Sequence, residues 1–508
     1  MKTDKFEIIA KTLQGVEEIL AEEIAEIGGE EITIGRRMVS FKGDKELLYK
    51  ANFRCRTALK ILKPIYKFEA RDTDELYRKA AQYEWENILT PKSTFAIDSV
   101  VYSDDFRHSK FAAYRVKDAI ADRFTDKYGA RPSVSLTNAD ILINLHISGR
   151  ECTLSLDSSG ESLHKRGYRT VQTEAPINEV LAAAMLKMAG WDGSSNLLDP
   201  MCGSGTILIE AALIATNTPP GIYRQGYAFE RWNDFDAELL NTIYNDDRGE
   251  KEFNYKIYGC DISPRAIEIA RSNIKNAHLE KYIETEVCPI QEQAEPHTPC
   301  LIVTNPPYGE RLAPRDLADI YKALGSKLKH LYTGGEAWII SSSQEGFNNI
   351  GLKPSERHRL MNGQLECEYR KYELFGGKYK DAKTNKATGK QDDKPAPRKH
   401  ESDKKQSSRP DKKEKPGKAE KAGKTRKEET RPKQYGIAEK QAKSEKPYPP
   451  KKERTNTEQA ETPSEKKEMI HGEEFMTRFI KFRKPSLIND GETQAKLFRK
   501  RKKKEEGE

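Results

Sequence analysis

The spacing of hydrophobic and polar residues changes near residue 169. Before that point, alternating runs predict strands and 3.6-residue periodicity predicts helices, a mixture typical of α+β modules. The expected strands are 31–34, 38–41, 94–102, 139–147 and 152–157, and the expected helices are 15–27 and 109–128. Beyond it, short apolar strands alternate with helices, which predicts a parallel α/β sheet. Its expected strands are 196–199, 256–260, 301–303 and 337–341.

Two predicted helices carry local signals that fix their orientation or their start. On the helix 109–128, helical spacing puts Phe111 and Phe124 near the buried face and leaves Lys110 and Lys117 largely for solvent. After the strand 256–260, Ser263 is the expected N-cap, with a proline at the first helical position.

The charge of the chain is unevenly distributed. The 508 residues carry a formal charge of +8, but residues 381–508 alone hold 38 basic and 24 acidic side chains, a net of +14. The first 380 residues therefore hold 50 basic and 56 acidic side chains, a net of −6. A segment so charged and so poor in apolar residues cannot offset its ordering entropy by burial. We predict a folded body followed by a disordered basic tail, 380–508.

Composition excludes several classes of protein. The first residues are charged throughout and no run of 18 apolar residues occurs, so we expect neither secretion nor membrane spanning. The seven cysteines form no C-x-x-C pair, and the nine histidines are dispersed. This favours reduced thiols in a cytoplasmic protein and predicts no metal site.

The first candidate motif is a glycine-containing turn between a strand and a helix. Residues 199–206 read Asp-Pro-Met-Cys-Gly-Ser-Gly-Thr. Glycines let the backbone approach a ligand, and the helix that follows offers free N–H groups. Alone the motif is weak, because many such turns need glycine only to turn. Position 208 is Leu where a dinucleotide fingerprint needs Gly, so a pyrophosphate ligand is disfavoured.

Two further motifs follow the next strands. Asp261 ends the strand 256–260, where a carboxylate can hold the hydroxyls of a ribose, although a polar residue at a strand end is common. Because Ser263 is the better helix cap, we expect Asp261 to be free for a ligand. Residues 305–308 read Asn-Pro-Pro-Tyr. The prolines withhold two N–H donors, so outward carbonyls, the Asn305 amide and the Tyr308 ring suit an exocyclic amine on a planar base.

Together these motifs resemble those of class I S-adenosylmethionine-dependent RNA methyltransferases. More closely, the chain is similar to the N-terminal, guanine-N2-methylating halves of the large bifunctional bacterial 23S rRNA methyltransferases. The run 156–169, Leu-Asp-Ser-Ser-Gly-Glu-Ser-Leu-His-Lys-Arg-Gly-Tyr-Arg, is one of the stretches that match. The similarity covers roughly residues 5–375 and keeps the order and spacing of the motifs. No second cofactor loop follows Tyr379, so we expect one methylating domain.

The resemblance implies an architecture and a set of functional residues. A Rossmann-like methyltransferase domain, 165–379, would follow a ferredoxin-like segment, 1–45, and a THUMP RNA-binding domain, 46–157. The partner would be 23S rRNA or a pre-ribosomal particle, and the cofactor S-adenosylmethionine. The implied catalytic residues are Asn305, Pro306 and Tyr308, and the implied cofactor residues are Asp199, Cys202, Gly203, Gly205, Thr206, Asp261 and Asn305.

Two departures from the pattern stand out. Asp199 and Asp261 are 62 positions apart, more than the roughly 20 residues usual in a compact nucleotide fold. The resemblance attributes the excess to an insertion around residues 219–232 that members share. Many relatives also carry an acidic residue after the third strand of the family's sheet. At the corresponding place, 287–289, this chain reads Val-Cys-Pro. The contact to the cofactor's adenine is therefore left open.

RNA binding must come from local patches, because the body is not basic. The candidate residues are Arg107, Lys110, Arg115, Lys117, Lys165, Arg166 and Arg169, although such runs are often only solvated faces. Within the tail, an apolar cluster in 469–498 could order on RNA or on an unidentified partner. The alternatives to rRNA guanine-N2 methylation are methylation of a tRNA guanine or an adenine N6, and an RNA-binding ribosome assembly factor whose methylation is incidental.

The tail gives a first testable prediction. Its positive charge suits non-specific phosphate contact with release of counterions, which makes binding depend strongly on salt. Truncation after Tyr379 should therefore weaken RNA affinity at low salt and leave single-turnover methyl transfer intact. Filter binding over a salt series measures the first effect. Unchanged affinity would mean that the tail only keeps the protein soluble.

Overall fold

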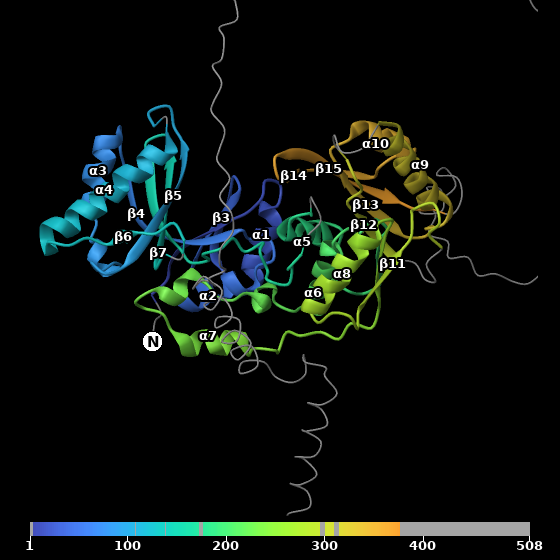
Figure 1. The fold of residues 1–508 in the computed structure, drawn as a ribbon, viewed down its shortest axis with the longest axis horizontal. Helices are drawn as coiled ribbons and strands as arrows, with labels where there is room; N and C mark the ends of the chain where they lie inside the picture. Colours follow the sequence, from blue (N-terminus) through green and yellow to red (C-terminus); the bar gives the residue numbers. More distant parts are fainter. Residues whose placement is uncertain are drawn as a thin grey trace, which may run out of the picture. The chain divides into compact units, whose positions relative to one another are not determined.

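The computed structural model describes residues 4–106, 108–137, 139–171, 176–294, 300–308 and 314–375. These residues form two β-sheets, each with its own helices (Figure 1). The predicted basic tail, 380–508, lies outside them. In the described part of the chain, no helix combines the length and the apolar character that crossing a membrane requires.

The first sheet has eight strands in the order β2-β3-β1-β4-β8-β7-β5-β6. All neighbours pair antiparallel except β5, which pairs parallel with β6 and with β7. Its strands are β1 (Phe6–Lys11), β2 (Glu30–Gly35), β3 (Met38–Gly43), β4 (Lys60–Glu69), β5 (Thr94–Tyr102), β6 (Ser133–Val134), β7 (Ile141–Ser148) and β8 (Glu151–Asp157). Its helices are α1 (Glu17–Glu26), α2 (Lys45–Arg54), α3 (Thr73–Gln82), the short 3₁₀ turn η1 (Trp85–Asn87) and α4 (Ser109–Tyr128).

The long strand β4 belongs to both halves of this sheet. Its first three residues pair with β1, and residues 62–69 pair with β8 across an irregularity between Pro64 and Tyr66. A proline cannot donate to a ladder, which accounts for a break at this point. One continuous strand therefore joins the segment predicted as ferredoxin-like to the segment predicted as the THUMP domain.

Helix α4 has the predicted bounds but turns a different face to the sheet at its start. Ala112, Val116, Ile120 and Phe124 are buried, whereas Phe111, expected on that face, is 51% exposed. The strand β5 lies close to the start of α4, as shown by the hydrogen bond that the Ser99 hydroxyl donates to the first carbonyl of α4 at 2.8 Å. Alanine fits such a close approach and a phenylalanine ring does not.

The second sheet has seven strands in the order β11-β10-β9-β12-β13-β15-β14. The first five run parallel: four of them correspond to the predicted strands, β11 was not predicted, and β15 and β14 are antiparallel additions at one edge. Its strands are β9 (Asn196–Asp199), β10 (Ile257–Asp261), β11 (Ile283–Val287), β12 (Cys300–Thr304), β13 (Glu336–Ser341), β14 (Glu356–Asn362) and β15 (Leu365–Glu373). Its helices and 3₁₀ turns are α5 (Glu179–Met188), α6 (Thr206–Ala215), η2 (Pro220–Tyr223), α8 (Pro264–Asn276), α9 (Pro314–His330) and α10 (Gln344–Ile350). The 3₁₀ turn η3 (Ala228–Arg231) and α7 (Ala237–Tyr244) follow η2 in the chain but pack in the core of the first sheet, against α2.

The strand order of the second sheet reverses at β9. This strand pairs parallel with β10 on one side and with β12 on the other. The loops that leave β9, β10 and β12 at their carboxyl ends therefore diverge, and a crevice forms between them. The helix after β10 begins as predicted, because the Ser263 hydroxyl accepts the backbone N–H of Ala266 at 3.2 Å.

The loop before α1 packs against the edge strand β14. Val16 is fully buried in one core with Leu360 of β14, and Leu13 packs against the same core. Gly15 has a φ of +85°, and a Cβ added there would lie 2.6 Å from the carbonyl oxygen of Arg359. Only glycine therefore fits between the first sheet's loop and the second sheet's edge.

Replacing Gly15 by alanine tests this contact. We expect the variant to lose about 1–3 kcal/mol of stability to the clash with the β14 backbone. Gly28 is a matched control, since its φ is also positive, at +97°, but a Cβ there would meet nothing within 4 Å. Thermal unfolding of both variants measures the difference. An equal loss of stability in the two variants would mean that it comes from the backbone strain that they share and not from the contact with β14.

Candidate functional site

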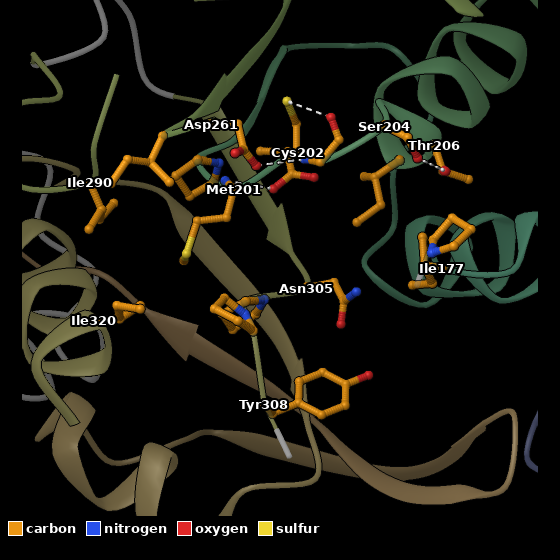
Figure 2. A pocket seen from close by; sticks show the side chains of 18 of the residues that line it. Ile177, Met201, Cys202, Ser204, Thr206, Asp261, Ile290, Asn305, Tyr308 and Ile320 are labelled. Carbon is orange, nitrogen blue, oxygen red and sulfur yellow. Dashed lines mark hydrogen bonds between the residues drawn. The ribbon is translucent and has the colours of Figure 1, made fainter. Parts of the chain in front are cut away.

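A cavity of about 620 Å³ opens at the carboxyl ends of β9, β10 and β12 (Figure 2). This volume is within the range of small-molecule sites. Strand ends and loops separated by more than 100 positions in the sequence converge on it. Its lining includes the predicted residues Asp199, Cys202, Gly203, Thr206, Asp261, Asn305, Pro306 and Tyr308.

Asp199, at the end of β9, connects two of the loops. Its side chain is 1% exposed, and Oδ1 accepts hydrogen bonds from the Met201 backbone at 3.1 Å and from the Thr304 hydroxyl at 2.7 Å. Burial raises the pKa of the Asp199 carboxyl to about 7, although these two hydrogen bonds act in the opposite direction. Asp199 therefore links two loops by hydrogen bonds at the base of the cavity and also forms part of the cavity wall.

Asp261, at the end of β10, is held from two sides. Oδ2 accepts the backbone N–H of Gly203 at 2.9 Å, and Oδ1 accepts that of Ser263 at 2.9 Å. The expectation that Asp261 would be free is therefore corrected: both oxygens already accept backbone hydrogen bonds. Each carboxylate oxygen has a second lone pair, so the group can still accept a hydroxyl from the cavity.

The glycines of the loop 199–206 have different tasks. Gly203 has a φ of +53°, and a Cβ there would meet no atom within 4 Å, so the backbone faces open space beside the cavity. Gly205, with a φ of +80°, is the N-cap of α6, and a Cβ there would lie 3.2 Å from Ala270. Cys202 is buried, which raises the pKa of its thiol well above the ordinary value.

Asn305 and Tyr308 follow β12 and reach the cavity from its opposite side (Figure 2). The Oδ1 atom of Asn305 is buried and has no hydrogen-bond partner among the described residues. The hydroxyl of Tyr308 accepts from the Asn362 amide at 2.5 Å, and burial raises the pKa of this phenol above its ordinary value. Residues 309–313, which follow the Asn-Pro-Pro-Tyr motif, lie outside the described residues.

Several lining residues lie outside the motifs that predicted the site. Ile262, Cys288, Ile290 and Gln291 lie on the loops after β10 and β11, and Asn362, Gln364 and Leu365 lie at the turn between β14 and β15. Ile262 follows Asp261 directly in the sequence, and an apolar residue after that carboxylate was a signal that could have been used. In the structure this isoleucine is 71% exposed. The hairpin left no signal, because its approach to the cavity is set by strand order alone.

Two of the predicted RNA-binding arginines are corrected by their burial. The guanidinium of Arg166 is 2% exposed, lies 3.4 Å from the Glu210 carboxylate and donates to the Leu163 carbonyl at 2.8 Å. Arg169 donates to the Ile177 carbonyl at 3.0 Å and to the Thr206 hydroxyl at 2.7 Å. Arg169 also lies 3.3 Å from the Glu179 carboxylate, and its side chain is 12% exposed. Guanidinium groups engaged in this way are not available to a phosphate, and both instead hold neighbouring segments of the chain together.

The other predicted cations differ in how free they are. Arg115 lies 2.8 Å from Asp74, Lys117 lies 2.6 Å from Asp118, and Lys165 lies 2.6 Å from Glu161. Lys110 is exposed, and Arg107 lies outside the described residues. Surface pairs of this kind are weak and can exchange for a phosphate, so the predicted contacts of these residues stay predictions.

Three family descriptions match the chain in succession. The ferredoxin-like domain description covers residues 7–62, the THUMP domain 70–157, and the RMKL-like methyltransferase domain 166–371. A protein of Synechocystis named putative RNA methyltransferase is 37% identical over 369 residues, which are 72% of this chain and 96% of that protein. The chain belongs to the RMKL-like methyltransferase family. The resemblance and the fold class inferred from the sequence are thereby confirmed, and the predicted domain boundaries stay predictions.

Other relatives of this RMKL-like chain are longer. A protein of Syntrophotalea carbinolica named ribosomal RNA large subunit methyltransferase K/L is 39% identical over 374 residues, 71% of this chain and 52% of that protein. The chain thus spans about half the length of that relative. A crystal structure of a putative methyltransferase in complex with SAH is 27% identical with a TM-score of 0.67, and the match covers 74% of this chain and all of that one. S-adenosylmethionine, of which SAH is the demethylated product, is the cofactor of this family.

The residues around the cavity fit such a cofactor. The open space above Gly203 admits a ligand close to the backbone, and the Asp261 carboxylate retains acceptor capacity for hydroxyls. Ile262 and Ile290 add apolar surface to the lining of the cavity, and Gln291 adds an amide.

The raised pKa of Asp199 makes a prediction about stability. The folded protein holds a proton on this carboxyl up to a pH of about 7, whereas the unfolded chain loses it near pH 4. The contribution of Asp199 to the free energy of unfolding therefore falls as the pH rises from 4 to 7 and is constant above 7. An Asp199→Asn variant has no titrating group at this position, so it should gain stability relative to the wild type between pH 5 and pH 8. Melting temperatures at both pH values give the comparison, and a pH-independent difference would contradict it.

Proposed function

We propose that the protein transfers a methyl group from S-adenosylmethionine to the exocyclic N2 of a guanine in 23S rRNA. The observation that carries the proposal is the buried Oδ1 atom of Asn305, which has no partner among the described residues and lies in the cavity wall beside Pro306 and Tyr308. A buried acceptor without a donor is costly, and an exocyclic amine supplies that donor. The relatives named as rRNA methyltransferases support RNA as the substrate class.

The cofactor would be held by residues of three loops. Gly203 admits it close to the backbone, Asp261 accepts its ribose hydroxyls, and Ile262 with Ile290 flanks its base. Gln291 is our choice for the polar edge of the adenine, because it carries an amide and lines the cavity from the loop after β11. When bound, S-adenosylmethionine supplies a methyl group on a positively charged sulfur, which is a strong electrophile.

The chain's own residues would orient the attacking nitrogen. The N2 lone pair of guanine is delocalised into the ring, so the amine is a poor nucleophile. Asn305 Oδ1 and the Pro306 carbonyl accept its two N–H bonds, which draws the nitrogen toward tetrahedral geometry and aims its lone pair at the methyl group. As the nitrogen takes the methyl group from the sulfur, which is left as a neutral thioether, it would become acidic and release one proton to solvent, so no strong base is needed.

Tyr308 would receive the base. Taking a base out of its stack costs a few kcal/mol, and stacking on an aromatic ring offsets part of that cost. The ring of Tyr308 belongs to the cavity lining, and burial keeps its hydroxyl protonated. The tyrosine therefore supports the extruded guanine, while Asn305 and Pro306 fix the amine.

Replacing Asn305 by alanine tests the proposal. Loss of one preorganised hydrogen-bond group should lower the single-turnover rate by about 10²–10³-fold, with the affinity for S-adenosylmethionine unchanged. Rate is measured by transfer of labelled methyl to rRNA from a strain that lacks the gene, and affinity by calorimetry. Asn305→Asp, which keeps an acceptor oxygen, is the matched control and should retain more activity. An Asn305→Ala enzyme as active as the wild type would refute the scheme.

Mass spectrometry of the methylated RNA identifies the target. Under the proposal, one guanine of 23S rRNA gains an N2-methyl group with the wild type and not with Asn305→Ala. A methyl group found instead on tRNA or on an adenine N6 would leave the proposed chemistry of the site in place and show that the substrate is a different one. A catalytically inactive variant that fully restores ribosome assembly would favour the assembly-factor alternative.

A further inference from the structure

Tyr308 is held at two points that are far apart in the sequence. Its backbone belongs to the loop after β12, whereas its hydroxyl contacts the hairpin formed by β14 and β15. The Asn362 amide donates to this hydroxyl at 2.5 Å, and the Cys367 thiol lies 3.8 Å from it. Asn362 Nδ2 is thus the strong partner of the tyrosine among the described residues.

Asn362 sits at the point where the hairpin meets the cavity. It is the last residue of β14 and pairs with Leu365, the first residue of β15. Asn362 and Leu365 both line the cavity, and Leu365 is 51% exposed. The hairpin therefore forms the wall of the cavity on the side of Tyr308.

The base of the hairpin is fixed in the core. Tyr369 of β15 is fully buried and stacks on Trp338 of β13, with ring centroids 4.9 Å apart. On its outer edge, β14 is backed by Gly15 and Val16 of the loop before α1. Because the hairpin is held on both sides, Asn362 has a fixed position, and its amide can hold the hydroxyl of Tyr308 in place.

We propose that Asn362 is a positioning residue that sets the orientation of the Tyr308 ring for the incoming base. The inference rests on the proposed function. A tyrosine side chain has two rotatable bonds: a hydrogen bond at its far end fixes the direction of the ring axis, and because the accepting lone pair of a phenol lies in the ring plane, the bond also favours one rotation of the ring about that axis. Without Asn362 the hydroxyl keeps only a weak thiol contact, so the ring would sample orientations in which a base cannot stack.

A double-mutant cycle with Asn362→Leu and Tyr308→Phe tests this role. Each variant removes one side of the same hydrogen bond, so each should lower kcat on the RNA that the wild type methylates by about tenfold. The double variant should be no slower than either single variant, because the interaction is lost only once. KM for the RNA and the affinity for S-adenosylmethionine should stay close to the wild-type values, since the ring acts after the RNA is bound.

Two controls separate positioning from a general loss of structure. Asn362→Asp offers a carboxylate that can accept the tyrosine's own proton, so this variant should recover most of the rate that Asn362→Leu loses. Glu366→Ala alters an exposed residue of the same hairpin outside the cavity lining and should leave the rate unchanged.

The outcomes distinguish this inference from the proposed function. An Asn362→Leu enzyme as fast as the wild type, or single effects that multiply in the double variant, would overturn the role of Asn362 alone. A wild-type enzyme that transfers no methyl group to any RNA would overturn the proposed function, and with it the inference.

Discussion

The buried carboxylate of Asp199 is the constraint on which the site depends. It ends the central strand β9 and accepts hydrogen bonds from its own loop and from Thr304 at the end of β12. A short-chain carboxylate in this place fixes two strand ends at hydrogen-bond distance, and the loops that carry Gly203 and Asn305 then start from defined points. Burial without a counter-charge is expensive for an ionised acid, which is why its pKa is raised to about 7. Burying this carboxyl is unfavourable, but its hydrogen bonds fix the relative positions of the two strand ends.

Buried polar contacts also fix the segment that links the two sheets. Arg166 lies against Glu210 of α6, and the Tyr168 hydroxyl donates to the same carboxylate at 3.0 Å. Glu23 of α1 accepts from the backbone N–H groups of residues 56 and 57 and lies 3.4 Å from Lys187 of α5. Such pairs add little net stability because desolvation offsets their attraction, but breaking one costs about 3–5 kcal/mol. They favour one arrangement of the chain over others.

Under the proposed function, the site would act mostly by alignment. The loop after β12 carries Asn305, whose buried Oδ1 has no partner among the described residues, and Tyr308, whose hydroxyl accepts a hydrogen bond from Asn362. The contrast has a physical meaning: a group that must meet the substrate keeps its capacity free, and a group that must only present a face is anchored by its polar end. An edge hairpin provides that anchor, and the loop before α1 backs the hairpin.

The sequence by itself determined four of the five parallel strands after residue 169, the glycine-containing loop 199–206, the position of Asp261 at a strand end and the Asn-Pro-Pro-Tyr loop. Each depends on local spacing, strand periodicity or turn chemistry, which neighbouring residues carry within a few positions. It failed for Arg166 and Arg169, because charge predicts exposure only until the fold brings a partner near in space, Glu210 for the first and Glu179 for the second. It also had no access to Asn362 or Gln291, since neither belongs to a motif. Only the tertiary structure decided those contacts, because the order of strands in a sheet joins residues that no periodicity connects.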